Sequence, residues 1–297
     1  MKKTIYAISC VIISIFIIKT NVKAQETINL NTEDDYFNAI TTINTSEETD
    51  FVMNLESDVV LSNYPTTSNP VSVSNNKNVT ILGNGHKLSI SNIGSYGHHP
   101  IMNVGSGVTI TLGKSDGTDT LSIEGGGTTV STSESLFNVS GTVNMYAGVS
   151  IGNNHSGNGA LTGGAFDLNT NGTINMFGGK IHDNSSTGVC LGGAVVLDDS
   201  NTTFNMYDGL FENNRTCSVG AAYGGAIGIY DVSQTAKVNI EGGTFKNNSS
   251  LYGGAIGNIF GILSVKNAIF ENNTAKNEDE DDGSGGAILE YANIDKN

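Results

Sequence analysis

The chain has 297 residues, of which 37% are apolar, 38 are Gly, 3 are Pro and none is Trp. This apolar content is too low for the thick core of an ordinary globule, and it favours an elongated structure whose interior is one or two side chains wide. The formal net charge of −15 and the single Arg, Arg215, exclude a nucleic-acid-binding protein, because phosphate contacts require clustered Lys and Arg.

Residues 1–24 have the pattern of a secretory signal peptide, with two Lys near the start, an apolar run over 5–18 and a small-residue cleavage site that ends at Ala24. Cleavage there removes four Lys and no acidic residue, which changes the formal net charge from −15 to −19. The alternatives are an uncleaved anchor, although about 14 apolar residues are few for a bilayer span, and a lipoprotein signal at Cys10. We expect a secreted or cell-surface protein with no integral membrane segment in the mature chain.

A helix is predicted directly after the first mature residues. Thr32 suits the N-cap, acidic residues occupy the first turn, and the apolar residues that follow have helical spacing: Tyr36, Phe37, Ile40 and Ile43. We interpret this helix as a cap over the open end of a solenoid. The rest of the segment 25–137 contains runs such as "NVTILGNGHKLSI" (78–90), which are typical of strand, Gly turn and strand and predict irregular early coils.

The segment 138–297 carries a repeat of two elements. Gly-Gly-Ala begins at positions spaced 29, 32, 29 and 32 residues apart: Gly163, Gly192, Gly224, Gly253 and Gly285. Between these corners lie related stretches such as "FNMYDGLFENN" (204–214) and "VNIEGGTFKNN" (238–248), whose short apolar–polar alternation predicts strands. A fixed period of this length with no amphipathic helix indicates a single-domain parallel β-helix over 25–297.

In such a fold each repeat position forms a column along the axis. We expect Phe211, Phe245 and Phe270 to stack in the core above Ile181. The Asn at the end of each FxxN-like stretch would form a second column at a corner that tolerates left-handed backbone, with amides bonded to their copies: Asn184, Asn214, Asn248 and Asn273. The Gly pairs would give a tight corner without side-chain clashes.

The connections after the FxxN Asn vary in length, which predicts that 185–191, 215–223 and 274–284 project from one side of the rod. Cys190 and Cys217 lie in equivalent connections and could form a disulfide between neighbouring coils, while two unrelated buried thiols are the alternative. After the acidic run 278–282, the last Gly-Gly-Ala corner is not followed by another FxxN. We therefore expect either a longer protein or another chain that covers this edge.

The joint recurrence of GGA[I/V/F] and FxxN over about residues 140–288 resembles the repeats of the polymorphic outer membrane proteins of Chlamydia-type adhesins. The preceding coils look like the wider pectate-lyase-like β-helix superfamily. The resemblance implies a right-handed coil and a surface-exposed passenger domain involved in adhesion and virulence. That family's usual C-terminal transmembrane barrel has no counterpart in this sequence, so outer-membrane association would require another component.

An enzyme that acts on acidic polysaccharides is the main alternative. Lyase chemistry would need stacked carboxylates holding Ca²⁺ together with a basic residue, and the candidates are Asp167, Asp198, Asp199 and Asp231. No Lys recurs beside them, and solvated turn carboxylates explain them more simply. The His pairs, 98–99 and 155 with 182, lack carboxylate or Cys at metal-ligand spacing and are interpreted as exposed loop residues.

These patterns predict a non-enzymatic, adhesin-like scaffold with no catalytic, metal-binding or cofactor site. The expected partners are a host-cell surface, a matrix protein or a glycan. A structural envelope component is a third possibility. The sequence does not specify the ligand, because the repeat defines a scaffold.

Overall fold

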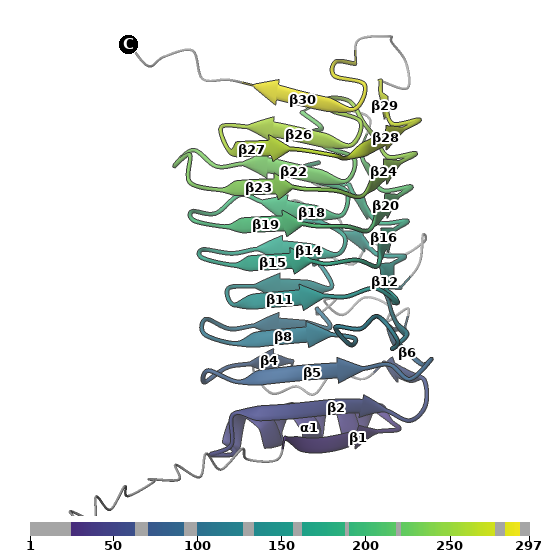
Figure 1. The fold of residues 1–297 in the computed structure, drawn as a ribbon, viewed down its shortest axis with the longest axis vertical. Coiled ribbons are helices and arrows are strands. Elements are labelled where there is room, and N and C mark those ends of the chain that lie inside the picture. Colours follow the sequence, from purple (N-terminus) through teal and green to yellow (C-terminus); the bar gives the residue numbers. More distant parts are fainter. Residues whose placement is uncertain are drawn as a thin grey trace, which may run out of the picture.

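The computed structural model describes residues 25–62, 71–91, 100–126, 134–156, 162–187, 190–217, 221–276 and 283–291. In this part of the chain, short strands stack in coils along one long axis, with a single helix at the N-terminal end (Figure 1). Strands of successive coils pair in parallel, as β11, β15 and β19 do. The predicted all-β parallel solenoid and its capping helix are therefore confirmed.

The described strands form four sheets, which we name A, B, C and D. Sheet A has nine strands: β1 (Glu26–Leu30), β2 (Asp50–Leu55), β5 (Asn78–Leu82), β8 (Thr109–Leu112), β11 (Thr142–Met145), β15 (Thr173–Met176), β19 (Thr203–Met206), β23 (Lys237–Ile240) and β27 (Ile262–Val265). Sheet B has eight strands: β3 (Val59–Leu61), β6 (Lys87–Ile90), β9 (Leu121–Glu124), β12 (Val149–Gly152), β16 (Lys180–His182), β20 (Leu210–Glu212), β24 (Thr244–Lys246) and β28 (Ile269–Glu271).

Sheet C also has eight strands: β4 (Ser72–Val73), β7 (Met102–Val104), β10 (Phe137–Val139), β14 (Phe166–Leu168), β18 (Val195–Leu197), β22 (Ile227–Tyr230), β26 (Ile256–Ile259) and β30 (Ile288–Tyr291). Sheet D has five strands: β13 (His155–Ser156), β17 (Ser185–Ser186), β21 (Arg215–Thr216), β25 (Ser249–Ser250) and β29 (Thr274–Ala275). In a complete coil the chain passes through sheets A, B, D and C in that order.

Helix α1 (Glu33–Thr45) lies against the first coil and covers the N-terminal end of the stack (Figure 1). Its N-terminus is fixed by a capping box, in which the Thr32 side chain accepts from the backbone N–H of Asp35 while the Asp35 carboxylate accepts from that of Thr32. Tyr36 and Ile43 of its apolar face are fully buried. The helix thus shields core side chains that the first coil would otherwise expose.

The core is a narrow apolar interior between the sheets, because strands such as β11, β15 and β19 alternate inward apolar and outward polar side chains. Phe211 stacks on Phe245 with ring centroids 5.1 Å apart, and Phe245 stacks on Phe270 at 5.0 Å. Ile181 lies in register below Phe211. These aromatic side chains form one continuous column along the axis.

The Asn side chains form a second, buried column beside the aromatic one. Asn184 donates to Asn214, Asn214 donates to Asn248, and Asn248 donates to Asn273. The sequence interpretation placed the left-handed backbone at these Asn residues, and this was wrong. The left-handed backbone is at the residue before each of them, namely Asp183, Asn213, Asn247 and Asn272, with φ between 51° and 58°. The turn residue lies outside and the following Asn can then point inward.

The Gly pairs lie where the backbones of successive coils approach closely. A Cβ on Gly225 would come within 2.3 Å of the Gly254 carbonyl oxygen and within 2.5 Å of the Ser249 backbone. The first Gly of the pair takes a left-handed φ at four of the corners: Gly192, Gly224, Gly253 and Gly285. Gly163 does not, but a Cβ there would meet the Ala194 carbonyl oxygen at 2.6 Å.

Sheet D was missed by the sequence interpretation, which treated 185–191, 215–223 and 274–284 as projecting connections. The first two residues of each connection instead form a short strand, and only the residues beyond it vary in number. Arg215, for example, pairs with Ser185 of the preceding coil and Ser249 of the following one. Two-residue strands are too short for an alternation pattern to reveal.

Candidate ligand-binding site

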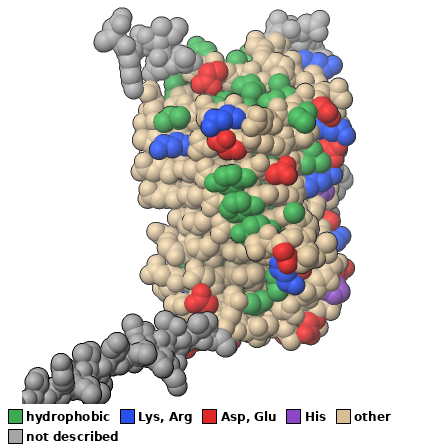
Figure 2. Space-filling view, in the orientation of Figure 1, with side chains coloured by type: hydrophobic (Ala, Val, Ile, Leu, Met, Phe, Trp, Pro, Cys, Tyr) green, Lys and Arg blue, Asp and Glu red, His purple; other side chains and the backbone are tan. Residues whose placement is uncertain are grey.

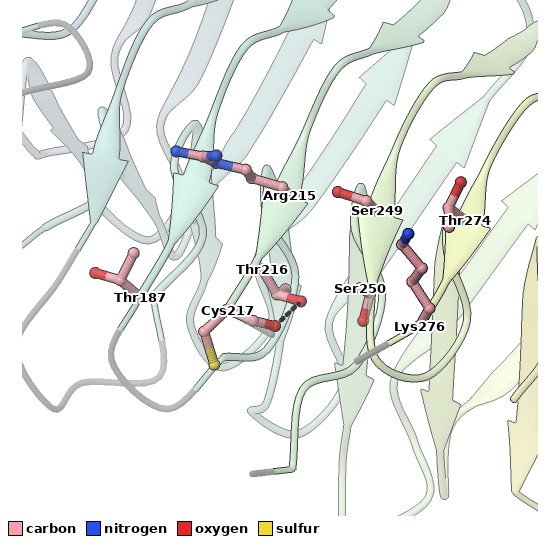
Figure 3. A pocket seen from close by; sticks show the side chains of 8 residues that line it. All are labelled: Thr187, Arg215, Thr216, Cys217, Ser249, Ser250, Thr274 and Lys276. Atoms are coloured by element: carbon pink, nitrogen blue, oxygen red, sulfur yellow. Dashed lines mark hydrogen bonds between the residues drawn. The ribbon is translucent and has the colours of Figure 1, made fainter. Parts of the chain in front are cut away.

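A pocket of about 480 Å³ lies along sheet D (Figure 3). It is lined by side chains that follow the buried Asn column by one to three positions: Thr187, Arg215, Thr216, Cys217, Ser249, Ser250, Thr274 and Lys276. Because the Asn column fixes each coil at this corner, the residues directly after it are held in register from coil to coil. The pocket is thus built on strand positions of several coils.

Two cations border the pocket, Arg215 from β21 and Lys276 directly after β29. Strand β25, which carries Ser249, lies between them in the sheet. Figure 3 shows the Arg215 side chain extending toward Thr187, while Lys276 lies on the side of Ser249 and Thr274. With neighbouring strands about 4.8 Å apart, the two cations begin on backbones that are roughly 10 Å apart.

Among the described residues, neither cation has an ion-pair partner and no carboxylate lines the pocket. By contrast, several other Lys side chains pair with Glu, as in Lys180 with Glu212 at 2.8 Å and Lys266 with Glu241 at 2.9 Å. The described lining of the pocket therefore carries two positive charges and no negative one, on a chain whose net charge is −15. At physiological ionic strength charges beyond about 8 Å are largely screened, so this local pair dominates the field that a ligand meets.

The hydroxyl groups of the pocket have two roles. Those of Thr187 and Ser250 donate to backbone carbonyl groups, at 3.2 Å to Ser156 and 2.9 Å to Ala222. The hydroxyls of Ser249, on the strand between the two cations, and of Thr274, on the strand that Lys276 follows, make no hydrogen bond within the described part of the chain. They can donate to an anionic oxygen of a ligand in the pocket.

A disulfide joins Cys217 at the pocket wall to Cys190, with Cα atoms 5.4 Å apart. It ties the connection after β21 to the connection of the preceding coil. Buried Leu251 and Ala222 pack with Cys190 in a small apolar cluster beside it. The wall of the pocket is therefore covalently attached to the coil below.

His155 lies next to this region, on β13, and is buried, whereas the sequence interpretation placed it in an exposed loop. Burial lowers its pKa, and the positive charge of Arg215 lowers it further. Its Nδ1 contacts the hydroxyl of Ser185. His182 is on β16 and contacts Ser150 at 2.8 Å, so it is also part of the sheet structure. His98, His99 and the acidic run 278–282 lie outside the described residues.

The carboxylates considered for polysaccharide cleavage do not share one column. Asp199 and Asp231 follow strand residues that are in register, but Asp167 is aligned with Val196 instead. Asp199 accepts hydrogen bonds from the backbone and hydroxyl of Thr170. Asp231 accepts from backbone N–H groups of its own turn, and in the described part of the chain no three His, Cys, Asp or Glu residues are arranged to hold a metal ion.

Asp167 and Asp198 have unusual titration properties. Burial, together with the neighbouring negative charges of Asp198, Asp199 and Glu134, raises the pKa of Asp167 to about 8. Burial and Asp199 raise the pKa of Asp198 to about 6. Asp167 can therefore hold a proton at neutral pH, whereas Asp198 is mostly ionised there.

Sequence reasoning missed the pocket. The sequence interpretation placed Arg215 in a variable connection and assigned no role to Lys276. One available signal was the recurrence of small hydroxyl residues within two positions after each FxxN Asn, as in Thr216, Ser249-Ser250 and Thr274. No protein-family model, curated protein or solved structure matches the chain. Within the described residues, no helix has the length and apolar composition to cross a membrane.

Proposed function

We propose that the protein is a secreted or cell-surface scaffold that acts as a non-enzymatic, adhesin-like binding protein. In this proposal, the pocket around Arg215 and Lys276 captures one acidic group of an extracellular glycan. The observation that carries the proposal is the presence of these two cations, which have no ion-pair partner among the described residues, together with the hydroxyls of Ser249 and Thr274 in a pocket whose described lining contains no carboxylate.

Secretion is supported by the leader pattern in residues 1–24 and by the disulfide between Cys190 and Cys217, since disulfides persist mainly in oxidising compartments. The overall acidity supports a ligand with one or a few acidic groups, because a long polyanion would also approach the many carboxylates outside the pocket. A terminal acidic sugar meets this condition.

The test is binding of the secreted protein to immobilised sialyllactose and to lactose, which differ by one acidic sugar. We expect binding to sialyllactose only, and a loss of about tenfold or more for Arg215→Ala and for Lys276→Ala, equivalent to about 1.4 kcal/mol each. Lys246→Ala is the matched control, because it removes the same charge from a Lys that is paired with Glu212 outside the pocket. Equal losses in all three variants would reject the pocket as the site.

A polysaccharide-active enzyme is kept as a second candidate, because the pKa of Asp167, raised to about 8, is that of a general acid that is protonated at neutral pH, and the ionised Asp198 is its neighbour. The test is incubation with polygalacturonate while following unsaturated products and new reducing ends. Cleavage by the protein that is lost in Asp167→Asn would favour the enzyme over the binding scaffold.

A further inference from the structure

The outward face of sheet A carries a regular uncharged surface that the pocket on sheet D does not use. In each of three successive coils, the outward residues are a Thr, an Asn and then an aromatic residue. We call these nine residues the platform: Thr142, Asn144 and Tyr146; Thr173, Asn175 and Phe177; and Thr203, Asn205 and Tyr207. The register of β11, β15 and β19 aligns them in three rows parallel to the long axis, which we call files. The Thr residues form the hydroxyl file, the Asn residues the amide file, and Tyr146, Phe177 and Tyr207 the aromatic file.

The files are ordered by contacts between equivalent side chains. The rings of Tyr146 and Phe177 stack with centroids 5.0 Å apart, and those of Phe177 and Tyr207 are also 5.0 Å apart and nearly parallel at 5°. Phe177 is 40% and Tyr207 48% exposed, and Figure 2 shows hydrophobic side chains in a file along this face. Because the faces of Phe177 are covered by its neighbours, the file offers ring edges to a ligand.

The amide file has hydrogen-bonding capacity to spare. Asn175 Nδ2 donates to Asn144 Oδ1 at 2.9 Å, and Asn205 Nδ2 donates to Asn175 Oδ1 at 2.9 Å. Each such bond uses one of two N–H groups on the donor and one of two lone pairs on the acceptor. An amide in the middle of the file therefore keeps one donor and one acceptor for an external partner.

The hydroxyl file is available as well. The hydroxyls of Thr142, Thr173 and Thr203 are partly exposed and make no hydrogen bond to other described residues. The platform thus combines an apolar strip with two files of donors and acceptors that repeat at the spacing of the coils. A ligand that matches it must also repeat, and must have both hydroxyl groups and apolar edges.

The charge of the platform restricts the ligand further. None of its nine side chains is charged. Toward the C-terminus, charged residues enter the same files in the next coil, at Lys237 and Glu241, and toward the N-terminus the Thr file reaches a charge three coils away, at Asp50. An acidic polymer would find no cation on the platform and would be repelled by a chain whose net charge is −15. A neutral polymer has no charged group that must be desolvated when it binds.

We propose that the platform binds an extended chain of a neutral polysaccharide that lies parallel to the long axis. Successive sugar hydroxyls exchange hydrogen bonds with the amide and hydroxyl files, while the C–H groups on the apolar faces of the sugar rings contact the aromatic file. One sugar unit is about as long as one coil step, so equivalent contacts repeat in the three coils. This site is separate from the sheet D pocket and does not depend on the function proposed for it.

The experiment measures binding of the secreted protein to cellohexaose and mannohexaose, with polygalacturonate as the acidic comparison. We expect the protein to bind at least one neutral oligosaccharide, with affinity reduced about tenfold or more in the double variant Phe177→Ala/Tyr207→Ala. The variant Asn175→Asp keeps the shape of the amide and should weaken binding by adding a charge and removing a donor.

Tyr230→Ala is the matched control, because Tyr230 is an aromatic residue of 40% exposure on sheet C. Unchanged binding in Tyr230→Ala and in Arg215→Ala would support the platform and separate it from the pocket. Absence of binding to both neutral probes, or full binding by the double variant, would overturn the proposal. So would a change of oligomeric state in the double variant, since that result would assign the face to a second copy of the chain.

Discussion

Asn184 donates two hydrogen bonds to the side-chain oxygen of Asn214, from its backbone N–H at 3.1 Å and from Nδ2 at 3.1 Å. Asn214 bonds to Asn248 in the same way, at 2.9 and 3.1 Å, and its Nδ2 also donates to the Ile181 carbonyl at 2.9 Å. These three Asn side chains are at most 1% exposed. The buried amides therefore join successive coils where water cannot replace a lost partner.

Replacement of Asn214 should destabilise the solenoid strongly. Asn214→Ala leaves two donors of Asn184 and the Ile181 carbonyl without their partner, and each buried unsatisfied group costs about 1–3 kcal/mol. Asn205→Ala is the control, because the same ladder contact is lost on a face that water reaches. Urea unfolding followed by circular dichroism should show a much lower midpoint for Asn214→Ala than for Asn205→Ala. Similar midpoints would contradict the role of burial.

The two aromatic stacks should differ in the same way. Phe245→Ala opens a cavity between Phe211 and Phe270 and should lower the free energy of unfolding by about 3–5 kcal/mol. Phe177→Ala removes a ring that is stacked on both sides but 40% exposed, and should cost about 1 kcal/mol. Thermal melts of both variants provide the measurement, and a larger loss for Phe177→Ala would refute the comparison.

The Gly pairs allow a comparison at equivalent corners. A Cβ at Gly225 meets the backbone of the neighbouring coil at 2.3 to 2.5 Å, whereas a Cβ at Gly286 meets no atom of the described residues within 4 Å. Gly225→Ala should therefore destabilise the protein by about 1–3 kcal/mol or more through overpacking, and Gly286→Ala should be nearly neutral. Because Ser249 supplies part of the clash, Gly225→Ala should also weaken ligand capture in the sheet D pocket. An unchanged melting temperature for Gly225→Ala would disprove the close approach.

Stability should fall as the pH rises above about 4, because of Asp167. Burial and neighbouring acids raise its pKa in the folded protein to about 8, above the unfolded value near 3.9, so its favourable contribution is complete below that unfolded value. The contribution is lost as the pH rises through 8, and Asp198 adds a similar loss through about 6. Asp167→Asn should raise stability at pH 8 by about 1 kcal/mol or more and flatten the profile.

Asp231 should have the opposite effect on the pH dependence of the free energy of unfolding. Burial alone would raise its pKa, but hydrogen bonds from the backbone of Ala236, Thr235 and Ser233 lower the pKa below its ordinary value. Its contribution is therefore present above the unfolded pKa and is lost as the pH falls. Asp231→Asn should reduce stability at pH 7, and a gain there would contradict the assigned hydrogen bonds.

The solenoid could be predicted from the sequence because its repeat reports on contacts between adjacent coils. The spacing of the Gly-Gly-Ala corners fixes the length of a coil, and the recurrence of Phe211, Phe245 and Phe270 marks an inward position. The capping helix could be predicted equally well, since the Thr32 capping box and the apolar face of α1 are local features. The position of the left-handed turn residue could not be predicted, because either of two adjacent polar residues could adopt that conformation.

By itself, the sequence determined the period, the inward columns and therefore the stacked coils, because each coil is built from residues close together along the chain. Only the tertiary structure decided which outward residues meet. Arg215 and Lys276 belong to different repeats, and their types do not recur at equivalent positions. They border one pocket because sheet D holds β21, β25 and β29 side by side. Core positions must repeat to exclude water, whereas surface positions are free to differ, so the sites they form depend on the stacking.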